Sequence, residues 1–238
     1  MGQLGIYYIN LDDRIDRAEN IQETLYDSGL LDRAQTSIER VSAVDTRRAN
    51  RAALEALCGD QITSTSLAAI DRGYRQEHGE LTSGSIGLYL SMLDTLRRFL
   101  ASENECALIF EDDASLATGV TAKDVAAVID KALEEQKQGS YDVLLLSHLF
   151  SGDTAHFLWM DVTRFMMLSA FMVTRAGAQK ILAAALPMRQ QLDWCLSDLS
   201  QMGQLHIQAV LPVLFVQQPF FIDGQWDSMQ MDQPYRQT

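Results

Sequence analysis

Short, mostly apolar runs recur along the chain and predict β-strands. Each run is bounded by charged or turn-forming residues, and most are rich in β-branched or aromatic side chains. The runs cover residues 4–11, 37–44, 106–110, 141–147, 164–174 and 205–211. The methionine-rich part of the fifth run, residues 165–173, is interpreted as core.

Between these runs, apolar residues recur at helical spacing. Helices are predicted at 14–28, 83–100, 121–138, 175–186 and 193–202, with shorter helical pieces and turns over 46–80. Gly29 and Gly203 are expected to end helices, and Thr174 to cap one. Strands that alternate with helices predict an α/β domain with a mostly parallel sheet flanked by helices.

Composition narrows the functional classes. The 238 residues contain four prolines and no repeat or linker-like segment, so a single domain is expected. A net charge of −13 and a pI of about 4.6 argue against a nucleic-acid partner. No apolar stretch reaches the roughly 18 residues of a membrane span, and no secretory signal is evident. Three cysteines without metal-ligand spacing fit reduced thiols, so a cytoplasmic location is expected.

The stretch "ALIFEDDASL", residues 107–116, places three adjacent acids after an apolar strand. If the strand continues, Glu111 and Asp113 share one side and Asp112 points away. Oxygen ligands on one side suit Mg²⁺ or Mn²⁺, with substrate phosphates as the remaining ligands. The alternative is a strand end and turn, in which the acids bind local backbone amides. The residues alone leave both interpretations open.

Seven segments of the chain, taken in order, have a pattern found in a known family. They are "YYINLDDRIDRAENI" (7–21), "RVSAVD" (40–45), "LTSGSIGLYLS" (81–91), "ALIFEDDASL" (107–116), "YDVLLL" (141–146), "AFMVTRAGAQKIL" (170–182) and "LDWCL" (192–196). Together they resemble glycosyltransferase family 25, the lipopolysaccharide and procollagen galactosyltransferase-like group. The "INLD" opening and the "EDD" after an apolar strand are the most specific pair, and the resemblance covers roughly residues 4–220.

The resemblance implies a GT-A-type, Rossmann-like fold over residues 1–238, with a nucleotide-binding half at about 1–115 and an acceptor-binding half at about 116–238. It also implies roles for individual residues. A metal, Mn²⁺ or Mg²⁺, is expected on Asp113 and Glu111, and Asp193 is the first candidate for the catalytic base, ahead of Asp198. A late "P…Q" segment of the family matches Pro212 and Gln217. Nucleotide-sugar contacts are expected from Asn10, Leu11, Asp12, Arg14, Arg17, Ala43, Asp45, Glu111 and Asp112.

Some of these residues have plainer interpretations. Arg14 and Arg17 either bind phosphate or pair with acids at the start of their own helix, namely Asp12, Asp13, Asp16 or Glu19. Asp45 follows a strand, so without the resemblance it is expected to cap a helix. Asp193 has the same alternative, because it lies where a helix begins. An arginine patch from residues 47, 48, 51, 72 and 75 is a further possibility, although such clusters are commonly solvated helix faces.

The chain also departs from the family pattern. Asp13 stands where an arginine is usual, and Ser85 stands where the family carries a glutamate. Leu88 and Met92 replace a cysteine and a histidine. A polar helix face has therefore become apolar, which questions whether the usual sugar substrate is retained.

The resemblance implies metal-dependent transfer of a hexose, with galactose and inversion favoured, from a UDP-sugar to a glycan or glycolipid acceptor. Bacterial surface polysaccharide (lipopolysaccharide) biosynthesis is the expected setting, with possible peripheral contact to the inner membrane. The alternatives are a degenerate, non-catalytic module that binds nucleotide or glycan, a transferase acting on a protein side chain, and a nucleotidyltransferase.

Overall fold

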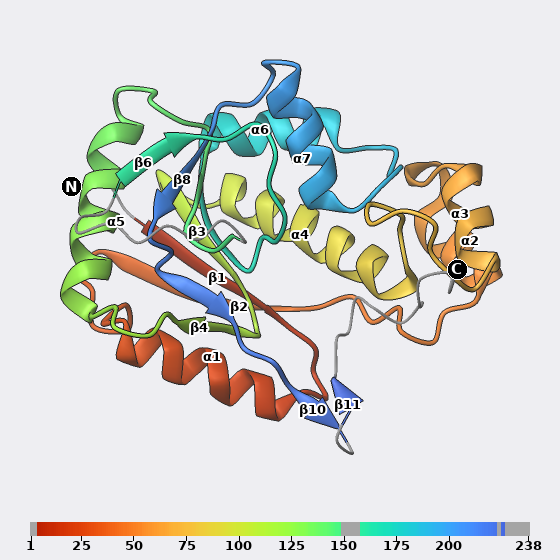
Figure 1. Ribbon diagram of the computed structural model, residues 1–238, viewed down its shortest axis with the longest axis horizontal. Coiled ribbons are helices and arrows are strands. Elements are labelled where there is room, and N and C mark those ends of the chain that lie inside the picture. Colours follow the sequence, from red (N-terminus) through yellow and green to blue (C-terminus); the bar gives the residue numbers. More distant parts are fainter. Residues whose placement is uncertain (1–3, 149–157, 223–224, 227–238) are drawn as a thin grey trace.

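The computed structural model describes residues 4–148, 158–222 and 225–226, and its centre is a seven-stranded sheet (Figure 1). The strand order is β2-β1-β3-β7-β5-β8-β6. β1, β2, β3, β5 and β8 run in one direction, and β7 and β6 run in the other. The predicted mostly parallel α/β sheet is confirmed. The strands are β1 (Leu4–Asn10), β2 (Thr36–Ser42), β3 (Cys106–Glu111), β5 (Val143–Leu145), β6 (Leu158–Asp161), β7 (Ala170–Thr174) and β8 (Ile207–Leu211).

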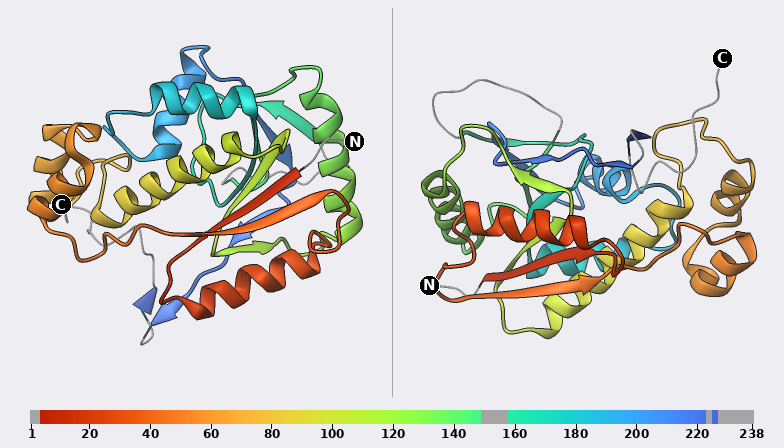
Figure 2. Two further views of the ribbon diagram at one scale, coloured as in Figure 1. Left: turned by 180° about the vertical axis from the view of Figure 1, so that it is seen from behind. Right: turned by 90° about the horizontal axis from the view of Figure 1, so that it is seen from below.

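Helices cover both faces of this sheet (Figure 2). Alternation along β1 shows why: Tyr7 and Ile9 belong to one apolar cluster, whereas Ile6 and Tyr8 belong to the other. α1 (Ile15–Asp27) and α5 (Ala122–Gln136) pack on the Ile6 face. α4 (Ser83–Ala101), α6 (Arg175–Ala184) and α7 (Leu192–Gln201) pack on the Tyr7 face. α2 (Arg51–Cys58), the 3-10 turn η1 (Gly59–Gln61) and α3 (Ser64–Asp71) lie together at one end.

Local chemistry sets the helix ends much as the sequence predicts. The Thr174 hydroxyl accepts a hydrogen bond from the Gly177 amide and caps α6. Gly29 and Gly203 follow α1 and α7 with φ values of 71° and 68°, a region that glycine enters without strain. Asp45, by contrast, caps no helix: α2 begins at Arg51, and its cap is Asn50. The expectation that Asp45 is a helix cap is wrong.

Two predicted strands are longer than the observed ones. The run 141–147 contains only the three residues of β5, and in the run 164–174 only Ala170–Thr174 form β7. Four short strands were missed altogether, in addition to β6: β4 (Ala114–Leu116) pairs antiparallel with β9 (Phe215–Gln217), and β10 (Phe221–Ile222) pairs antiparallel with β11 (Gln225–Trp226). Within the described ranges, no helix has the length and apolarity needed to cross a membrane.

Candidate active site

Three parallel strands end side by side at the edge where the candidate site lies. In the register of the sheet, Asn10 pairs with Ser42, and Ile9 pairs with Glu111. The carboxyl ends of β1, β2 and β3 therefore meet. Ligands of open α/β sheets bind beyond such ends.

The acidic triplet is a strand end followed by a tight turn. β3 stops at Glu111, and Asp112 and Asp113 form the turn into β4. Because the strand does not continue, the two aspartates converge: Arg17 Nη1 lies 3.1 Å from Asp112 Oδ1 and 3.2 Å from Asp113 Oδ2. The prediction that Asp112 points away from Asp113 is wrong.

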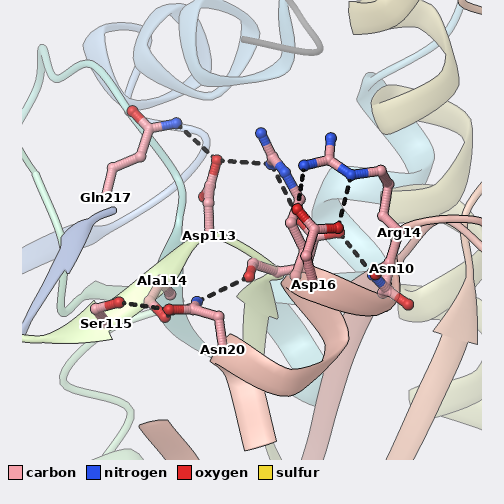
Figure 3. Close-up of polar contacts among 10 residues, drawn as sticks. Asn10, Arg14, Asp16, Asn20, Asp113, Ala114, Ser115 and Gln217 are labelled. Carbon is pink, nitrogen blue, oxygen red and sulfur yellow. Dashed lines mark hydrogen bonds and ion pairs between the residues drawn. The ribbon is translucent and has the colours of Figure 1, made fainter. Parts of the chain in front are cut away.

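Uncharged side-chain amides also donate hydrogen bonds to the acids of this turn (Figure 3). Asn10 Nδ2 donates to Asp112 Oδ2 over 2.8 Å, and Gln217 Nε2 donates to Asp113 Oδ2 over 3.0 Å. Asn20 Nδ2 donates to the backbone oxygens of Asp112 and Ala114, each at 3.0 Å. Residues from the stretch Asn10 to Asn20 and Gln217, about two hundred positions later, therefore hold the acids in place.

Burial raises the pKa of two of these acids. The pKa of Glu111 lies well above its ordinary value because of burial, with further contributions from the charges of Asp113 and Asp112. Burial also raises the pKa of Asp113, although Arg17 and Gln217 favour its ionised form. A single nearby guanidinium thus compensates only part of the cost of burying three acids.

One oxygen of the turn identifies where a cation would fit. Asp113 Oδ1 is buried and accepts no hydrogen bond from the residues that the structure describes, whereas Oδ2 accepts two. Buried carboxylate oxygens are normally satisfied, so this atom requires a partner. In the described part of the chain, no three acid, histidine or cysteine side chains form a metal cluster. Magnesium-like ions commonly take one or two carboxylates and complete their shell with substrate phosphates. The residues present fit such an ion.

A pocket that encloses about 580 Å³ opens above the acidic turn. It brings together most of the residues that the resemblance singles out, along with Gln217. Asp45 lies in its wall, where Arg47 Nη2 and Nε contact the two carboxylate oxygens at 2.7 and 2.9 Å. We call this space of about 580 Å³ the turn pocket. The predicted residues in its wall are Leu11, Arg17, Ala43, Asp45, Glu111, Asp112 and Asp113.

Three of the predicted nucleotide-sugar contacts lie outside the wall of the turn pocket, namely Asn10, Asp12 and Arg14. Asn10 supports Asp112 from below, and Asp12 is exposed and accepts hydrogen bonds from Arg40 and Ser42. Arg14 forms a two-pronged contact with Asp16, at 2.8 and 2.6 Å. Pairing with an acid at the helix start is therefore correct for Arg14. Arg17 differs, because the contacts described above join it to Asp112 and Asp113 of the acidic turn and not to an acid at the start of its own helix.

A second pocket, about 930 Å³, adjoins the first and contains Asp193. The two pockets share Leu88, Glu111 and Gln217 in their walls. Asp193 is the second residue of α7, and its carboxylate accepts hydrogen bonds from the backbone amides of Met167, at 3.2 Å, and Trp194, at 2.8 Å. It is not the helix cap, because Gln191 holds that position. We call this space the Asp193 pocket.

Burial raises the pKa of Asp193, while the Met167 and Trp194 amides favour the ionised carboxylate. A raised pKa suits a group that must accept a proton near neutral pH. Asp198, the second candidate base, accepts a hydrogen bond from Gln190 and lines neither pocket. Of these two candidates, Asp193 lines a pocket and Asp198 does not, and the role of Asp193 as the base stays a prediction.

Several residues of the site were not predicted from the sequence. Asn20 and Arg47 lie in polar stretches of the sequence, and no pattern there indicates that Asn20 binds the acidic turn or that Arg47 binds Asp45. Met167 has a φ of 78°, rare for a residue with a side chain, and lines the Asp193 pocket with Met166. The interpretation of the 165–173 stretch as core is therefore wrong for these two methionines.

Close packing fixes the loop after β2 against α4. A Cβ atom on Gly87 would lie 2.3 Å from the Val44 oxygen and 2.4 Å from Thr46 Oγ1. The Val44 amide also donates to Ser91 Oγ over 2.8 Å. The wall of the turn pocket that contains Ala43 and Asp45 is thereby held by the helix that also lines the Asp193 pocket.

The likeness of the chain to solved structures is low. One is the crystal structure of "A197 from STIV", with a TM-score of 0.45 and 12% sequence identity; the match covers 94% of this chain and 87% of that one. Another is the crystal structure of "S. aureus TarS 1-349", with a TM-score of 0.42 and 11% sequence identity; the match covers 91% of this chain and 60% of that one. At this level of similarity, neither contributes to the interpretation of the site. No curated protein matches the chain.

The family comparison is decisive, because it extends over most of the chain. The profile described as "Glycosyltransferase family 25 (LPS biosynthesis protein)" matches residues 3–196, which include the acidic turn and Asp193 but not Gln217. The chain therefore belongs to glycosyltransferase family 25.

Proposed function

We propose that this protein transfers a hexose from a UDP-sugar to a hydroxyl group of a glycan or glycolipid acceptor, with Mn²⁺ or Mg²⁺ as cofactor. The observation that carries the proposal is the buried Asp113 Oδ1 in the wall of the turn pocket, which has no hydrogen-bond partner within the described part of the chain. Galactose as the sugar, and inversion at its anomeric carbon, rest on the family resemblance. The proposed setting is the cytoplasmic side of bacterial surface polysaccharide synthesis, with peripheral contact to the inner membrane.

The turn pocket is the proposed nucleotide site. Ala43 and Asp45 would contact the uridine and ribose, and the acidic turn would face the diphosphate. Asp113 and Glu111 would hold the divalent cation, whose charge stabilises the leaving diphosphate when it is bound. Arg17 keeps the two aspartates of the turn together and reduces their mutual repulsion.

The Asp193 pocket is the proposed acceptor site. In the transfer step, the bond between the anomeric carbon and the β-phosphate oxygen breaks, and a bond forms between that carbon and the acceptor oxygen. The proton of the acceptor hydroxyl passes to the Asp193 carboxylate, and UDP leaves. Leu88, Glu111 and Gln217 line both pockets, which supports a position for the donor sugar near these three residues.

Calorimetric titration of the purified protein with UDP, with and without Mn²⁺, tests the proposal. Metal-dependent binding is expected for the wild type and is expected to be lost in Asp113→Asn, which keeps the shape of the side chain. If the folded wild-type protein does not bind UDP in either condition, the proposal is wrong. A UDP-release assay over a panel of UDP-sugars then identifies the donor.

A second candidate function is a non-catalytic module that binds nucleotide or glycan. It is favoured by Ser85, which stands where the family carries a glutamate. The Ser85 hydroxyl accepts a hydrogen bond from the Thr82 amide at 2.8 Å and donates to the Thr82 carbonyl at 3.0 Å, so it is used in capping α4. This candidate predicts that UDP binds but that no donor sugar is turned over.

A further inference from the structure

The Asp193 pocket has a wall that offers few hydrogen bonds to a ligand. Thioether and alkyl side chains from three segments form this wall. Leu88 and Met92 come from α4, Met166, Met167 and Leu168 from the loop before β7, and Leu192 from the start of α7. Two of them, Leu88 and Met92, are departures from the family pattern. We call these six residues the apolar wall.

Polar groups line other parts of the same pocket. Glu111 and Gln217 lie in the shared wall, Arg75, His78, Ser85 and Gln191 lie in the remaining wall, and the Asp193 carboxylate is fixed by two backbone amides. An accepting sugar that reaches Asp193 therefore meets polar groups, and the apolar wall is left for a part of the acceptor that forms no hydrogen bonds.

The energetics of the two kinds of acceptor differ at such a wall. A free oligosaccharide would place hydroxyl groups against side chains that do not hydrogen-bond, and each lost hydrogen bond to water is costly. An aryl or alkyl group would instead remove apolar surface from water on both sides. Methionine adapts its shape readily and makes favourable contacts with aromatic rings.

We infer that the acceptor carries an apolar group next to its accepting sugar, and that the apolar wall binds this group. The substrate class is thus an aryl or alkyl glycoside, or a lipid-linked sugar, rather than a free oligosaccharide. The assignment of the pocket to an acceptor rests on the proposed function; the apolar character of its ligand does not.

Binding measurements with matched glycosides test the inference without requiring turnover. The probes are the methyl, hexyl and 4-nitrophenyl β-glycosides of glucose and of galactose, titrated into the full chain with UDP and Mn²⁺ present. For at least one sugar, the 4-nitrophenyl or hexyl glycoside is expected to bind about tenfold more tightly than the methyl glycoside. The two apolar groups distinguish an aromatic from an aliphatic ligand.

Variants at Met166 locate the effect. This side chain is 39% exposed, so its replacement leaves the core intact. Met166→Gln is expected to remove most of the preference for the apolar glycoside, and Met166→Leu to keep it. Met202→Gln, at a methionine that is 62% exposed and lines neither pocket, serves as the control and is expected to change nothing.

The outcomes separate this inference from the proposed function. If UDP binds with Mn²⁺ but no sugar shows a preference for its apolar glycosides, the inference is wrong and the proposed function stands. A preference that persists unchanged in Met166→Gln also contradicts it, because the apolar group is then bound elsewhere. If the preference is found and depends on Met166, while UDP does not bind, the inference holds and the proposed donor is wrong.

Discussion

Arg17 Nη1 lies 3.2 Å from Asp113 Oδ2, although 96 residues separate the two in sequence. The same nitrogen lies 3.1 Å from Asp112 Oδ1, and the ring of Phe220 lies 4.7 Å from the guanidinium carbon. A helix that follows β1 thus supplies the positive charge for acids at the end of β3. The position of this arginine explains how the chain tolerates adjacent buried aspartates.

Replacement of Arg17 by methionine is expected to lower the free energy of unfolding at pH 7 by about 3–5 kcal/mol, the usual cost of breaking a buried ion pair from one side. The loss arises because two buried carboxylates stay without their cation. It should shrink at acidic pH, because burial raises the pKa of Asp113 and this carboxylate is then protonated. Urea unfolding at pH 7 and pH 4 measures both effects.

The control for this variant is Arg33→Met. Arg33 pairs with Asp130, whose side chain is 61% exposed, and exposed pairs contribute about 0–1 kcal/mol. Equal losses in the two variants would contradict the role assigned to Arg17.

Asp193→Asn is expected to reduce kcat by about 10²–10⁴-fold, the usual contribution of a general base, with little change in UDP affinity. Asp198→Asn is the matched control on the same helix, and its kcat is expected to stay near the wild-type value. A wild-type kcat in Asp193→Asn, measured by UDP release, would exclude Asp193 as the base.

The pH dependence of transfer follows from the raised pKa of Asp193. The base must be ionised, so kcat is expected to fall as pH decreases through this raised pKa, above the ordinary aspartate value of about 3.9. The stability of the fold changes with pH in the opposite direction. The contribution of the Asp193 carboxyl group to the free energy of unfolding is complete below its unfolded-state pKa and is lost as the pH rises through its folded-state pKa. A pH–rate profile for kcat, with unfolding measured in parallel, checks both directions.

Gly87→Ala is expected to destabilise the protein by about 1–3 kcal/mol, the range for an overpacked site. The added methyl group would collide with the Val44 oxygen and Thr46 Oγ1, so α4 and the loop after β2 must separate. UDP affinity should fall together with stability, because this loop carries Ala43 and Asp45. Wild-type stability in the variant would show that the helix and loop are not in this close contact.

Asn20→Ala is expected to cost about 1–2 kcal/mol, because its amide donates to two backbone oxygens of the acidic turn. Metal-dependent UDP binding should weaken as the turn loosens. Gln22→Ala, at an exposed position of the same helix, is the control and should leave both properties unchanged. Unaltered UDP binding in Asn20→Ala would mean that the turn keeps its shape without this support.

The elements that the sequence predicts well are those with a strong apolar period. α4 and β3 are predicted almost to the residue, because burial of one face or of the whole strand leaves a clear pattern. β6 was missed because its residues are largely exposed, and β4 and β9 are only three residues long. The run 164–174 was too long because an apolar pocket loop has the same composition as a strand.

The site was predicted only in part, for a related reason. Family resemblance placed Asp113, Asp45 and Asp193, and the geometry gathers them in two adjoining pockets. It did not give the contact from Arg17 to the acidic turn or the support from Asn20, since both depend on how α1 packs against β4. Nor does any local pattern distinguish Met166 in a pocket wall from Met172 in the core.

The pairing of β4 with β9 has a consequence for how the site is assembled during synthesis. β4 follows directly from the acidic turn, and its only partner strand in the described residues is β9, about a hundred positions later in the chain. A nascent chain released up to β8 can complete all seven strands of the central sheet while the Asp113 carboxylate still lacks Gln217. Gln217 can therefore join the acidic turn only after all strands of the central sheet have been synthesised, so the nucleotide pocket is among the last parts of the molecule to be completed.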